Sequence, residues 1–505
     1  MSRNRKHLLS KTALITLCAW LLEASAVWAA PPVIIHPTKD IMSSGSPTAG
    51  SIRSSMARKA VRAKGPQILK FEIHALGRLD SIVIHNKTGI HEGVIRRQLA
   101  FLKKGKPISA KDVQRAAGLV TDLSGVEAVV VSEPGSAPGT AVLHVTVLPD
   151  NSPRGDFSID NYGSRYLGYG EEMFNYDVRN LTHEGDSLFT HIETTGHKYT
   201  NGTIMYRRPV GKNGLSMNIG YSQLWYSQGA EFEWLQPHGS AKTFVMGVEY
   251  PVHRSQTHDL KVGLEYEYLD LKDEFRRGNV FFPGPPVPAN AYSVWNDKHA
   301  NAVTLSVTEK NLDKHGMTTW NLSYKYGHVS FDSERTHMFF DRTNCEGSYS
   351  KVTGVFLRHQ KLNERLALQL FVRGQLASRN MDTSGRMGIT GITGVKAYPI
   401  SEVAGDNAYF TRAELQWTLP LQAKEQKLQL LTYLEHGGIK MFKDPVDKNE
   451  KNHLHLQDIG LGLLWSKKDA WWVRADYAWK LGPEKPTSDI NHTNGHFWIQ
   501  GGFYF

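Results

Sequence analysis

The chain has 505 residues, 45 glycines, a formal net charge of +10 and a mean hydropathy of −0.39. This mean is too polar for a bundle of membrane-spanning helices, and the length exceeds that of one ordinary domain. A transmembrane β-barrel is not excluded, because only alternate residues of its strands face lipid.

Residues 1–29 have the order of a secretory signal peptide. Basic residues up to Lys11 are followed by the apolar residues 13–22 and by a small-residue cleavage pattern at Val27 and Ala29. The apolar run is about half as long as a spanning helix. We therefore predict export with cleavage after Ala29.

Residues 30–65 are rich in Ser, Pro, Gly and basic residues and show no sustained apolar period. This composition is typical of a linker. Residues 51–64 could form a short helix, and the sequence leaves that alternative open.

Residues 66–150 are predicted to form a small α+β domain with the order β-α-α-β-β. Alternating stretches up to Asn86 are followed by apolar residues at helical spacing. Ser109 and Asp112 form a capping pair for a second helix. Residues 125–132 and 140–148 then alternate as two further strands.

Residues 151–505 contain about sixteen alternating stretches, each long enough for a tilted strand to cross a bilayer. Short turns alternate with long connections, among them residues 270–298, as in bacterial outer-membrane barrels. Since each unpaired backbone group in hydrocarbon costs several kcal/mol, such strands must close into a ring. The predicted fold class is thus an all-β transmembrane barrel of about 16 antiparallel strands, wide enough for an aqueous lumen, with an N-terminal α+β domain.

The last ten residues form an amphipathic strand with an aromatic end, because Phe497, Ile499, Phe503 and Phe505 point to one side. This end resembles the C-terminal signal by which outer-membrane barrels are delivered for assembly. The expected partners therefore include the barrel-assembly machinery, outer-membrane lipid and lipopolysaccharide. Lys and Arg are dispersed without a known binding motif, so no nucleic-acid partner is expected.

Three motifs resemble those of the two-partner secretion outer-membrane transporters, the hemolysin-activator and filamentous-hemagglutinin transporter family. Residues 119–147 are similar to the family's polypeptide-transport-associated (POTRA) domain, and residues 160–165 to its first barrel strand. Residues 394–399 with Glu402 are similar to the signature of its long sixth loop. The resemblance implies a POTRA domain at 66–150, a 16-stranded barrel at 151–505 and an inward-folded loop at 382–405.

The resemblance also implies a contact between this loop and the barrel wall. In the family, an arginine at the loop tip pairs with an aspartate on the wall; the matching positions here are Lys396 and Glu435. The loop-tip motif is Val395, Lys396, Ala397, Tyr398 and Pro399. We expect Lys396 and Glu435 to latch the loop, although lysine lacks the two-pronged fork of arginine. In a wet lumen such a pair is expected to contribute about 1 kcal/mol.

The function implied is recognition of an unfolded partner exoprotein in the periplasm and its secretion through the barrel. The exoprotein's N-terminal secretion domain would dock on the POTRA domain. We expect residues 126–132 to be an edge strand whose free backbone groups, at Val126, Val129, Val130 and Val131, pair with an extended peptide. Val113 and Val120 of the second helix would form either the groove wall or the domain core.

Two alternatives share parts of this pattern. An outer-membrane assembly factor that inserts other barrels would usually carry more POTRA domains and an arginine at the loop tip. A passive porin would lack the preceding soluble domain. The family usually carries two POTRA domains and an N-terminal plug helix, whereas this chain has room for one POTRA domain.

We expect no enzyme activity, no cofactor and no metal. Four histidines near the chain end lack the Cys or carboxylate spacing of a metal site and are interpreted as loop residues: His453, His455, His492 and His496. The expected location is the outer membrane of a Gram-negative bacterium, with the POTRA domain in the periplasm.

Overall fold

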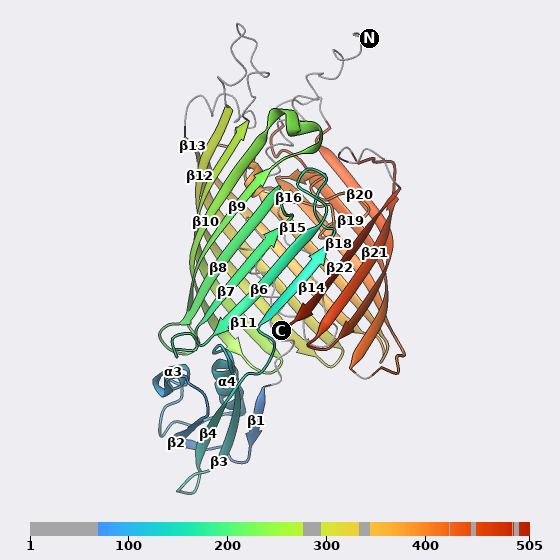
Figure 1. Ribbon diagram of the computed structural model, residues 1–505. Coiled ribbons are helices and arrows are strands. Elements are labelled where there is room, and N and C mark those ends of the chain that lie inside the picture. The colour runs from blue at the N-terminus through green and yellow to red at the C-terminus, as the bar shows by residue number, and fades with distance from the viewer. Residues whose placement is uncertain are drawn as a thin grey trace, which may run out of the picture.

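The computed structural model describes residues 69–275, 294–332, 344–423, 425–445, 451–486, 488 and 494–505. A small domain lies at one end of a wide barrel (Figure 1). The predicted signal peptide and linker, residues 1–65, lie outside the described residues. Within the described part of the chain, no helix combines the length and the apolar character needed to cross a membrane.

The N-terminal domain, residues 69–150, has one sheet covered by two helices. Its elements are β1 (Lys70–Ile73), β2 (Arg78–Asn86), α3 (Glu92–Gln98), α4 (Ala110–Thr121), β3 (Val126–Pro134) and β4 (Thr140–Pro149). The Ser109 side chain accepts a hydrogen bond from the Asp112 backbone N–H, and the Asp112 side chain accepts one from the Ser109 N–H. This reciprocal capping box starts α4, as the sequence predicts. Val113 and Val120 of α4 lie in the core against the sheet, which favours the core alternative.

The sheet order is β1-β3-β4-β2, so the prediction that residues 126–132 form a sheet edge is wrong. β3, which begins at Val126, pairs antiparallel with β4, and on its other side Val129, Val130 and Val131 pair in parallel with β1. The alternation of residues 68–74 indicated a strand, but periodicity does not tell which neighbour a strand pairs with. The edge strands of the described domain are β1 and β2.

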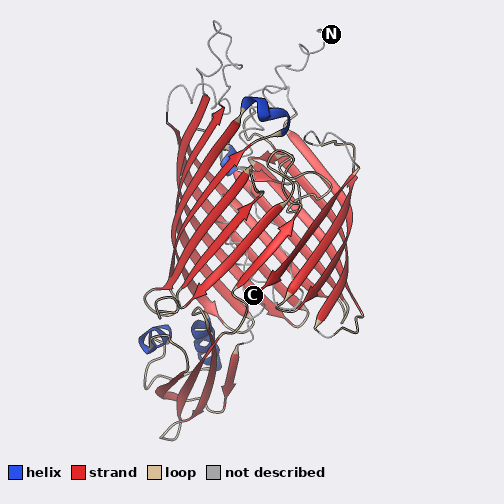
Figure 2. Ribbon diagram, in the orientation of Figure 1, coloured by secondary structure: helices blue, strands red, loops and turns tan. Residues whose placement is uncertain are grey.

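The barrel is a closed ring of sixteen strands, as predicted, and Figure 2 shows the strands wrapping around a common axis. Its strands are β5 (Gly155–Asp160), β6 (Glu171–Arg179), β7 (Ser187–Thr194), β8 (Tyr199–Pro209), β9 (Ser216–Ser227), β10 (Pro237–Arg254), β11 (His258–Phe275), β12 (Val294–Asp313), β13 (Gly316–Phe331), β14 (Gly347–Lys361), β15 (Leu366–Ala377), β18 (Asn407–Leu419), β19 (Gln426–Lys440), β20 (His453–Lys467), β21 (Trp471–Leu481) and β22 (Gly495–Tyr504). The last strand closes the ring by pairing antiparallel with the first, from Gln500 opposite Asp160 to Tyr504 opposite Asp156.

The wall is apolar outside and polar inside. On β20, Ile459, Leu461 and Leu463 are exposed on the outer face, whereas the neighbouring Asp458 points inward and is buried. This alternation matches a ring whose outer face contacts lipid. The wall therefore confirms the predicted fold class.

Some strands extend further than the sequence predicts. The segment 270–298 is expected to be a loop, yet β11 runs to Phe275 and β12 starts at Val294. The hydrogen-bond ladder continues through polar pairs such as Asp270 opposite Lys242 and opposite His299. Along this extension the outward positions are polar, at Asp270, Lys272 and Glu274, while Leu269 and Leu271 are buried on the inner face. The outward-apolar alternation used for prediction is therefore absent, although the pairing of the strands continues.

Candidate functional site

The segment between β15 and β18, residues 378–406, folds into the barrel. It contains a short 3₁₀ turn (Thr383–Gly385) and two short strands, β16 (Met387–Gly388) and β17 (Ala404–Gly405), that pair with each other. Side chains from several strands bind its backbone: Lys351 of β14 donates to the Gly385 carbonyl at 2.8 Å, and Arg373 of β15 to the Gly388 carbonyl at 2.8 Å. We name residues 378–406 the lumen loop.

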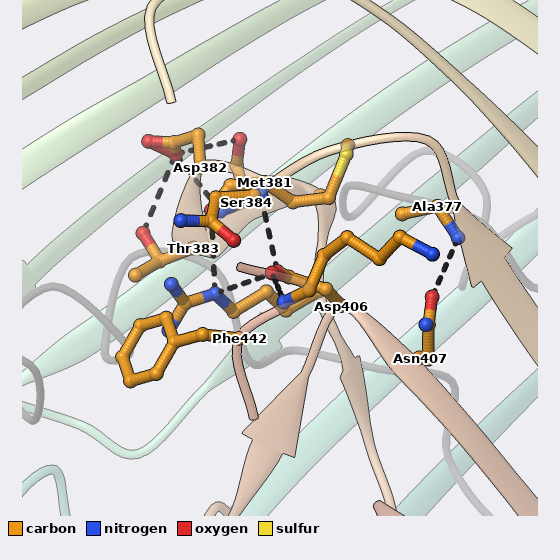
Figure 3. A network of polar contacts seen from close by, with 12 residues as sticks. Ala377, Met381, Asp382, Thr383, Ser384, Asp406, Asn407 and Phe442 are labelled. Carbon is orange, nitrogen blue, oxygen red and sulfur yellow. Dashed lines mark hydrogen bonds and ion pairs between the residues drawn. The ribbon is translucent and has the colours of Figure 1, made fainter. Parts of the chain in front are cut away.

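Two buried carboxylates fix the base of the lumen loop (Figure 3). Asp406 accepts hydrogen bonds from the Met381 N–H at 3.0 Å and the Lys443 N–H at 2.8 Å, and it pairs with Arg386 at 3.2 Å. Asp382 accepts from the Ser384 N–H at 3.0 Å and forms an ion pair with Lys298 on β12. Both ends of the loop are thereby tied to the wall.

A tight turn shapes the loop tip. Gly391 has φ +77°, and a Cβ on Gly394 would lie 2.1 Å from the Ile389 carbonyl oxygen. Only glycine fits such a close backbone approach. The turn brings the Val395 N–H to the Ile389 carbonyl at 2.8 Å and directs Lys396 toward the wall.

Lys396 contacts Glu435 of β19 through both its side chain and its backbone. Lys396 Nζ forms an ion pair with Glu435 Oε1, and the Lys396 N–H donates to Glu435 Oε2 at 2.8 Å. Lys396 Nζ also lies 3.8 Å from the centroid of the Tyr433 ring, a cation–π contact. The structure thus places the two predicted partners together.

The predicted wet setting for this pair is wrong, because each of the two residues is only 1% exposed. Trp498 of β22 helps to cover the pair, and its indole N–H donates to the Lys396 carbonyl at 2.7 Å. This contact spans a sequence separation of 102 residues, and only closure of the barrel brings the two residues together. A buried pair is not screened like a surface pair, and breaking one costs about 3–5 kcal/mol.

Sequence reasoning missed two further wall residues at the tip. Arg412 of β18 donates to Glu435 Oε1 at 2.5 Å and to the Ile392 carbonyl at 3.3 Å. Asp458 of β20 accepts from the Ala397 N–H at 2.7 Å. Arg412, Glu435 and Asp458 are direct cross-strand neighbours. The alternation of each strand indicates that these three side chains point into the lumen. Whether they are neighbours depends on the register between the strands.

A second buried charge cluster continues from the tip along the wall. Arg474 pairs with Asp476 at 2.7 Å and with Glu414 at 3.1 Å. Cations and anions are interspersed along this part of the wall, so the lumen loop is seated on a polar surface on which opposite charges are paired. Such a surface can hold the loop by direct contacts and can be hydrated when the loop leaves.

The other tip residues are also packed. Val395 and Ala397 are buried in a cluster with wall residues, and the Tyr398 hydroxyl donates to the Glu484 carbonyl at 3.1 Å. Pro399 is half-buried. The structure therefore brings Val395, Lys396, Ala397, Tyr398 and Pro399 to one site with Glu435. The predicted docking valines lie in the N-terminal domain.

The N-terminal domain contacts the end of the barrel where the tight turns are. Arg254 of β10 forms a two-pronged ion pair with Asp122, at 2.8 and 2.9 Å. Burial raises the pKa of the Asp122 carboxyl, but the Arg254 guanidinium outweighs this and lowers it to about 2. The Gly214 N–H donates to Gln98 Oε1 at 2.8 Å, and Arg115 donates to the Val252 carbonyl at 3.0 Å.

The histidines do not form a metal site in the described part of the chain, where no group of three or more His, Cys, Asp or Glu could hold an ion. His453 and His455 lie on the exposed face of β20, and the His455 ring stacks on His436 at 5.9 Å. His496 lies on β22 with its ring 4.2 Å from that of Trp498. His492 is outside the described residues.

A sixteen-strand membrane barrel with a polar lumen, a loop seated in it and a soluble domain at its turn end defines an outer-membrane transporter. The model of the family described as haemolysin secretion/activation protein ShlB/FhaC/HecB matches residues 139–450. This match covers more than half of the chain, and the chain belongs to that family.

Curated relatives are similar over most of the chain. The "Heme/hemopexin transporter protein HuxB" of Haemophilus influenzae is 23% identical over 431 residues, which are 84% of this chain and 73% of the relative. The "Outer membrane transporter CdiB" of Dickeya dadantii is 23% identical over 360 residues, 69% of this chain and 60% of the relative.

Solved structures share the fold. CdiB from Escherichia coli superimposes with a TM-score of 0.68 at 14% identity, covering 85% of this chain and 76% of that one. BamA from Haemophilus ducreyi lacking POTRA domains 1–3 gives a TM-score of 0.54 at 13% identity, with 85% of each chain covered. At these identities the likeness shows the fold alone.

Proposed function

We propose that this transporter recognises an unfolded partner exoprotein in the periplasm and secretes it through its own barrel. Family membership supports two-partner secretion, and the relatives named as heme/hemopexin and CdiB transporters support a secreted protein as cargo. The observation that carries the proposal is the lumen loop. Polar contacts hold it inside a complete hydrogen-bonded ring, so it can move aside without opening the wall.

Residues 69–150 act as a POTRA domain in the periplasm of a Gram-negative bacterium. Their position at the turn end of the barrel supports this role, because cargo bound there is delivered to the barrel mouth. The partner is an exoprotein with an N-terminal secretion domain. Lipopolysaccharide, outer-membrane lipid and the barrel-assembly machinery are the proposed surroundings of the barrel.

Lys396 and Glu435 act as the latch of the lumen loop. In the resting state Glu435 accepts from Lys396 and Arg412 together, so one carboxylate bridges two buried cations. Cargo entering the lumen exposes these groups to water, which replaces the lost hydrogen bonds. No nucleotide-binding motif is present in the sequence, so folding of the cargo outside the cell drives export.

A disulfide that locks the lumen loop tests this function. An ideal Cβ on Gly437 lies 3.3 Å from Val395 Cγ2, which makes Val395→Cys with Gly437→Cys a suitable pair in a Cys345→Ser background. The cargo is an epitope-tagged exoprotein from the reading frame beside this one, measured in the culture medium. We expect oxidation to block secretion and a reductant to restore it, while both single-cysteine variants secrete in either condition. Undiminished secretion through a fully cross-linked loop would contradict the proposed route.

A further inference from the structure

The outer face of the barrel has a hollow near the turn end. It lies across β15, β18, β19 and the turn before β15, and its volume is about 370 Å³. Volumes from about 300 Å³ upward are typical of sites for small ligands. Seven residues line the hollow: Asn363, Arg365, Leu366, Leu415, Trp417, Leu430 and Thr432.

The strand register places the hollow on the lipid-facing side of the wall. Leu366 lies opposite Trp417, which in turn lies opposite Leu430. Trp417 is 49% exposed, whereas Gln416 and Gln429, on the alternate positions of the same strands, are buried on the inner face. Since the outer face of a membrane barrel contacts lipid, the hollow is open to the bilayer.

Two tryptophans set the depth of the hollow in the bilayer. Trp417 faces Leu430 of β19, and Trp465 of β20 faces Leu428, two residues nearer the turns. Outward tryptophans near the end of a barrel mark the level of the lipid headgroups. The turn side of the hollow, with Arg365, therefore lies among the headgroups, and its other side reaches into the hydrocarbon.

Hydrogen-bond donors line the headgroup side. In the described part of the chain the Arg365 guanidinium forms no ion pair or hydrogen bond, whereas Arg358 of β14 pairs with Asp313 at 2.6 Å. Asn363 Oδ1 accepts from two backbone N–H groups of its own turn, at 2.9 Å each, so its amide nitrogen is left as a donor. The Trp417 indole N–H has no acceptor among the described residues. One cation and two N–H donors suit a negatively charged ligand with oxygen acceptors.

The hydrocarbon side is lined by leucines, at Leu366, Leu415 and Leu430. Thr432 follows Leu430 on the outward row of β19 and precedes Leu434. A threonine between two leucines leaves space beside them, because its side chain is shorter. An acyl chain fills that space through van der Waals contacts, which are the attraction that remains between apolar groups inside a bilayer.

The N-terminal domain does not cover the hollow. It contacts the turns between β6 and β7, between β8 and β9 and between β10 and β11. In the ring, four strands separate β10 from β15, and four separate β19 from β6. The domain projects from the same end of the barrel (Figure 1). With that end in the periplasm, the leaflet that covers the hollow is the phospholipid leaflet of the outer membrane.

We propose that the hollow binds one phospholipid with an anionic headgroup, such as phosphatidylglycerol. Arg365 pairs with the phosphate, and Trp417 and Asn363 donate to phosphate or ester oxygens. One acyl chain passes Thr432. The exposed turn residues 361–365 carry two cations and one carboxylate, which favours an anionic headgroup over a zwitterionic one. This inference deepens the proposed lipid surroundings of the barrel and rests on the orientation given with the proposed function.

Native mass spectrometry of the full chain in detergent, with phosphatidylglycerol added, tests the role of the cation. Arg365→Gln should retain at least about tenfold less of this lipid, because a charge-assisted contact with the phosphate is lost. Lys361→Gln removes the same charge from the same turn outside the hollow and should retain as much lipid as the parent. Full retention by Arg365→Gln, or an equal loss in both variants, would overturn the proposal.

Filling the hollow tests the place of the acyl chain. Thr432→Phe keeps all the donors and occupies the space between the leucines, so retention of phosphatidylglycerol should again fall at least about tenfold. Leu434→Phe, at the next outward position of β19, lies outside the hollow and is the matched control. Both changes add an apolar side chain to the lipid-facing wall, which a barrel tolerates. Undiminished retention by Thr432→Phe would overturn the proposed site.

Equimolar lipid mixtures test the identity of the ligand. The parent should retain phosphatidylglycerol at least about threefold over phosphatidylethanolamine and over lipid A, and Arg365→Gln should abolish the preference over phosphatidylethanolamine. Equal retention of either competitor by the parent would overturn the assigned lipid. These measurements contain no cargo, so their failure leaves the transport function standing. A parent chain that retains the lipid but secretes nothing in cells would overturn the proposed function alone.

Discussion

Two parts of the molecule rest on the barrel without belonging to its wall, and they are held in different ways. The lumen loop depends on buried charges, since Lys396 and Glu435 are each 1% exposed. The N-terminal domain depends on the Asp122–Arg254 pair, whose aspartate side chain is 24% exposed, and on separate hydrogen bonds that Gln98 accepts and Arg115 donates. Loss of one buried partner strands an uncompensated charge, whereas a partly exposed group can be rehydrated. The loop should therefore be released in one step, and the domain by degrees.

Removing the lumen loop should produce the largest effect. Deletion of residues 382–405 takes away the segment that crosses the lumen, and a sixteen-strand ring without it leaves a water-filled channel. In planar bilayers we expect a conductance at least about tenfold above that of the parent chain. A conductance equal to that of the parent would mean that the loop does not close the pore. Matching circular dichroism spectra of the parent and the deletion variant would show that the barrel still forms.

Glu435→Ala should release the tip by removing the shared acceptor of Lys396 and Arg412. Removing the carboxylate that both buried cations contact costs about 3–5 kcal/mol, so the open state should become populated even at rest. We expect frequent open events in single-channel records and protease cleavage within the loop. Glu435→Gln removes the charge but keeps the size of the side chain, and it is the matched control for Glu435→Ala.

A double-mutant cycle isolates the Lys396–Glu435 contact from general damage. With Lys396→Ala, Glu435→Ala and the double variant, the changes in opening free energy should be strongly non-additive, because either single change already breaks the pair. Additive changes would show that the two residues act independently and would end the latch hypothesis.

The domain joint should respond to acid. The pKa of Asp122 is lowered from its ordinary 3.8 to about 2, so the pair stabilises docking fully above about pH 4 and loses that contribution as the pH falls toward 2. The shift corresponds to about 2 kcal/mol. We expect energy transfer between dyes on the exposed Lys103 and Lys361 positions, converted to Cys in the Cys345→Ser background, to decrease over that pH range.

Asp122→Asn is the matched control for the acid response. It removes the titrating group, so docking should be weaker at pH 7 and nearly constant between pH 4 and pH 2. The same acid response in parent and variant would show that another group governs the joint. If the N-terminal domain were released in a single sharp step, as expected for the lumen loop, the two parts of the molecule would not differ in how they are held.

The sequence predicts the wall well because a bilayer imposes simple rules. A strand must be long enough to cross and must alternate its faces, and β20 obeys both over Ile459, Leu461 and Leu463. Outside the lipid the outer face of a strand need not be apolar. The sequence pattern therefore did not predict the extensions of β11 and β12.

The site is less predictable because it depends on register and closure. The loop motif was sufficient to place Lys396 against Glu435, whose role as a latch stays a prediction. The participation of Arg412 and Asp458 follows from the register of three neighbouring strands, which no local pattern specifies. Trp498, which helps to bury the Lys396–Glu435 pair, comes from the last strand of the ring. The burial of the pair could therefore not be predicted from the loop motif.

The smallest predicted effect lies inside the N-terminal domain and shows whether its fold and its joint are separable. Ser109→Ala removes the capping box at the start of α4, where Ser109 Oγ accepts from the Asp112 N–H at 3.3 Å, and should cost the domain about 1 kcal/mol. Hydrogen exchange of the α4 amides in the full chain should accelerate about fivefold, while dye-measured docking at pH 7 stays constant, because no capping group touches the barrel. Ser81→Ala, on the exposed part of β2, is the control and should leave α4 exchange unchanged. Loss of docking with Ser109→Ala would mean that the fold of the domain and its contact with the barrel form one cooperative unit. The domain and the lumen loop would then differ only in how deeply their charges are buried.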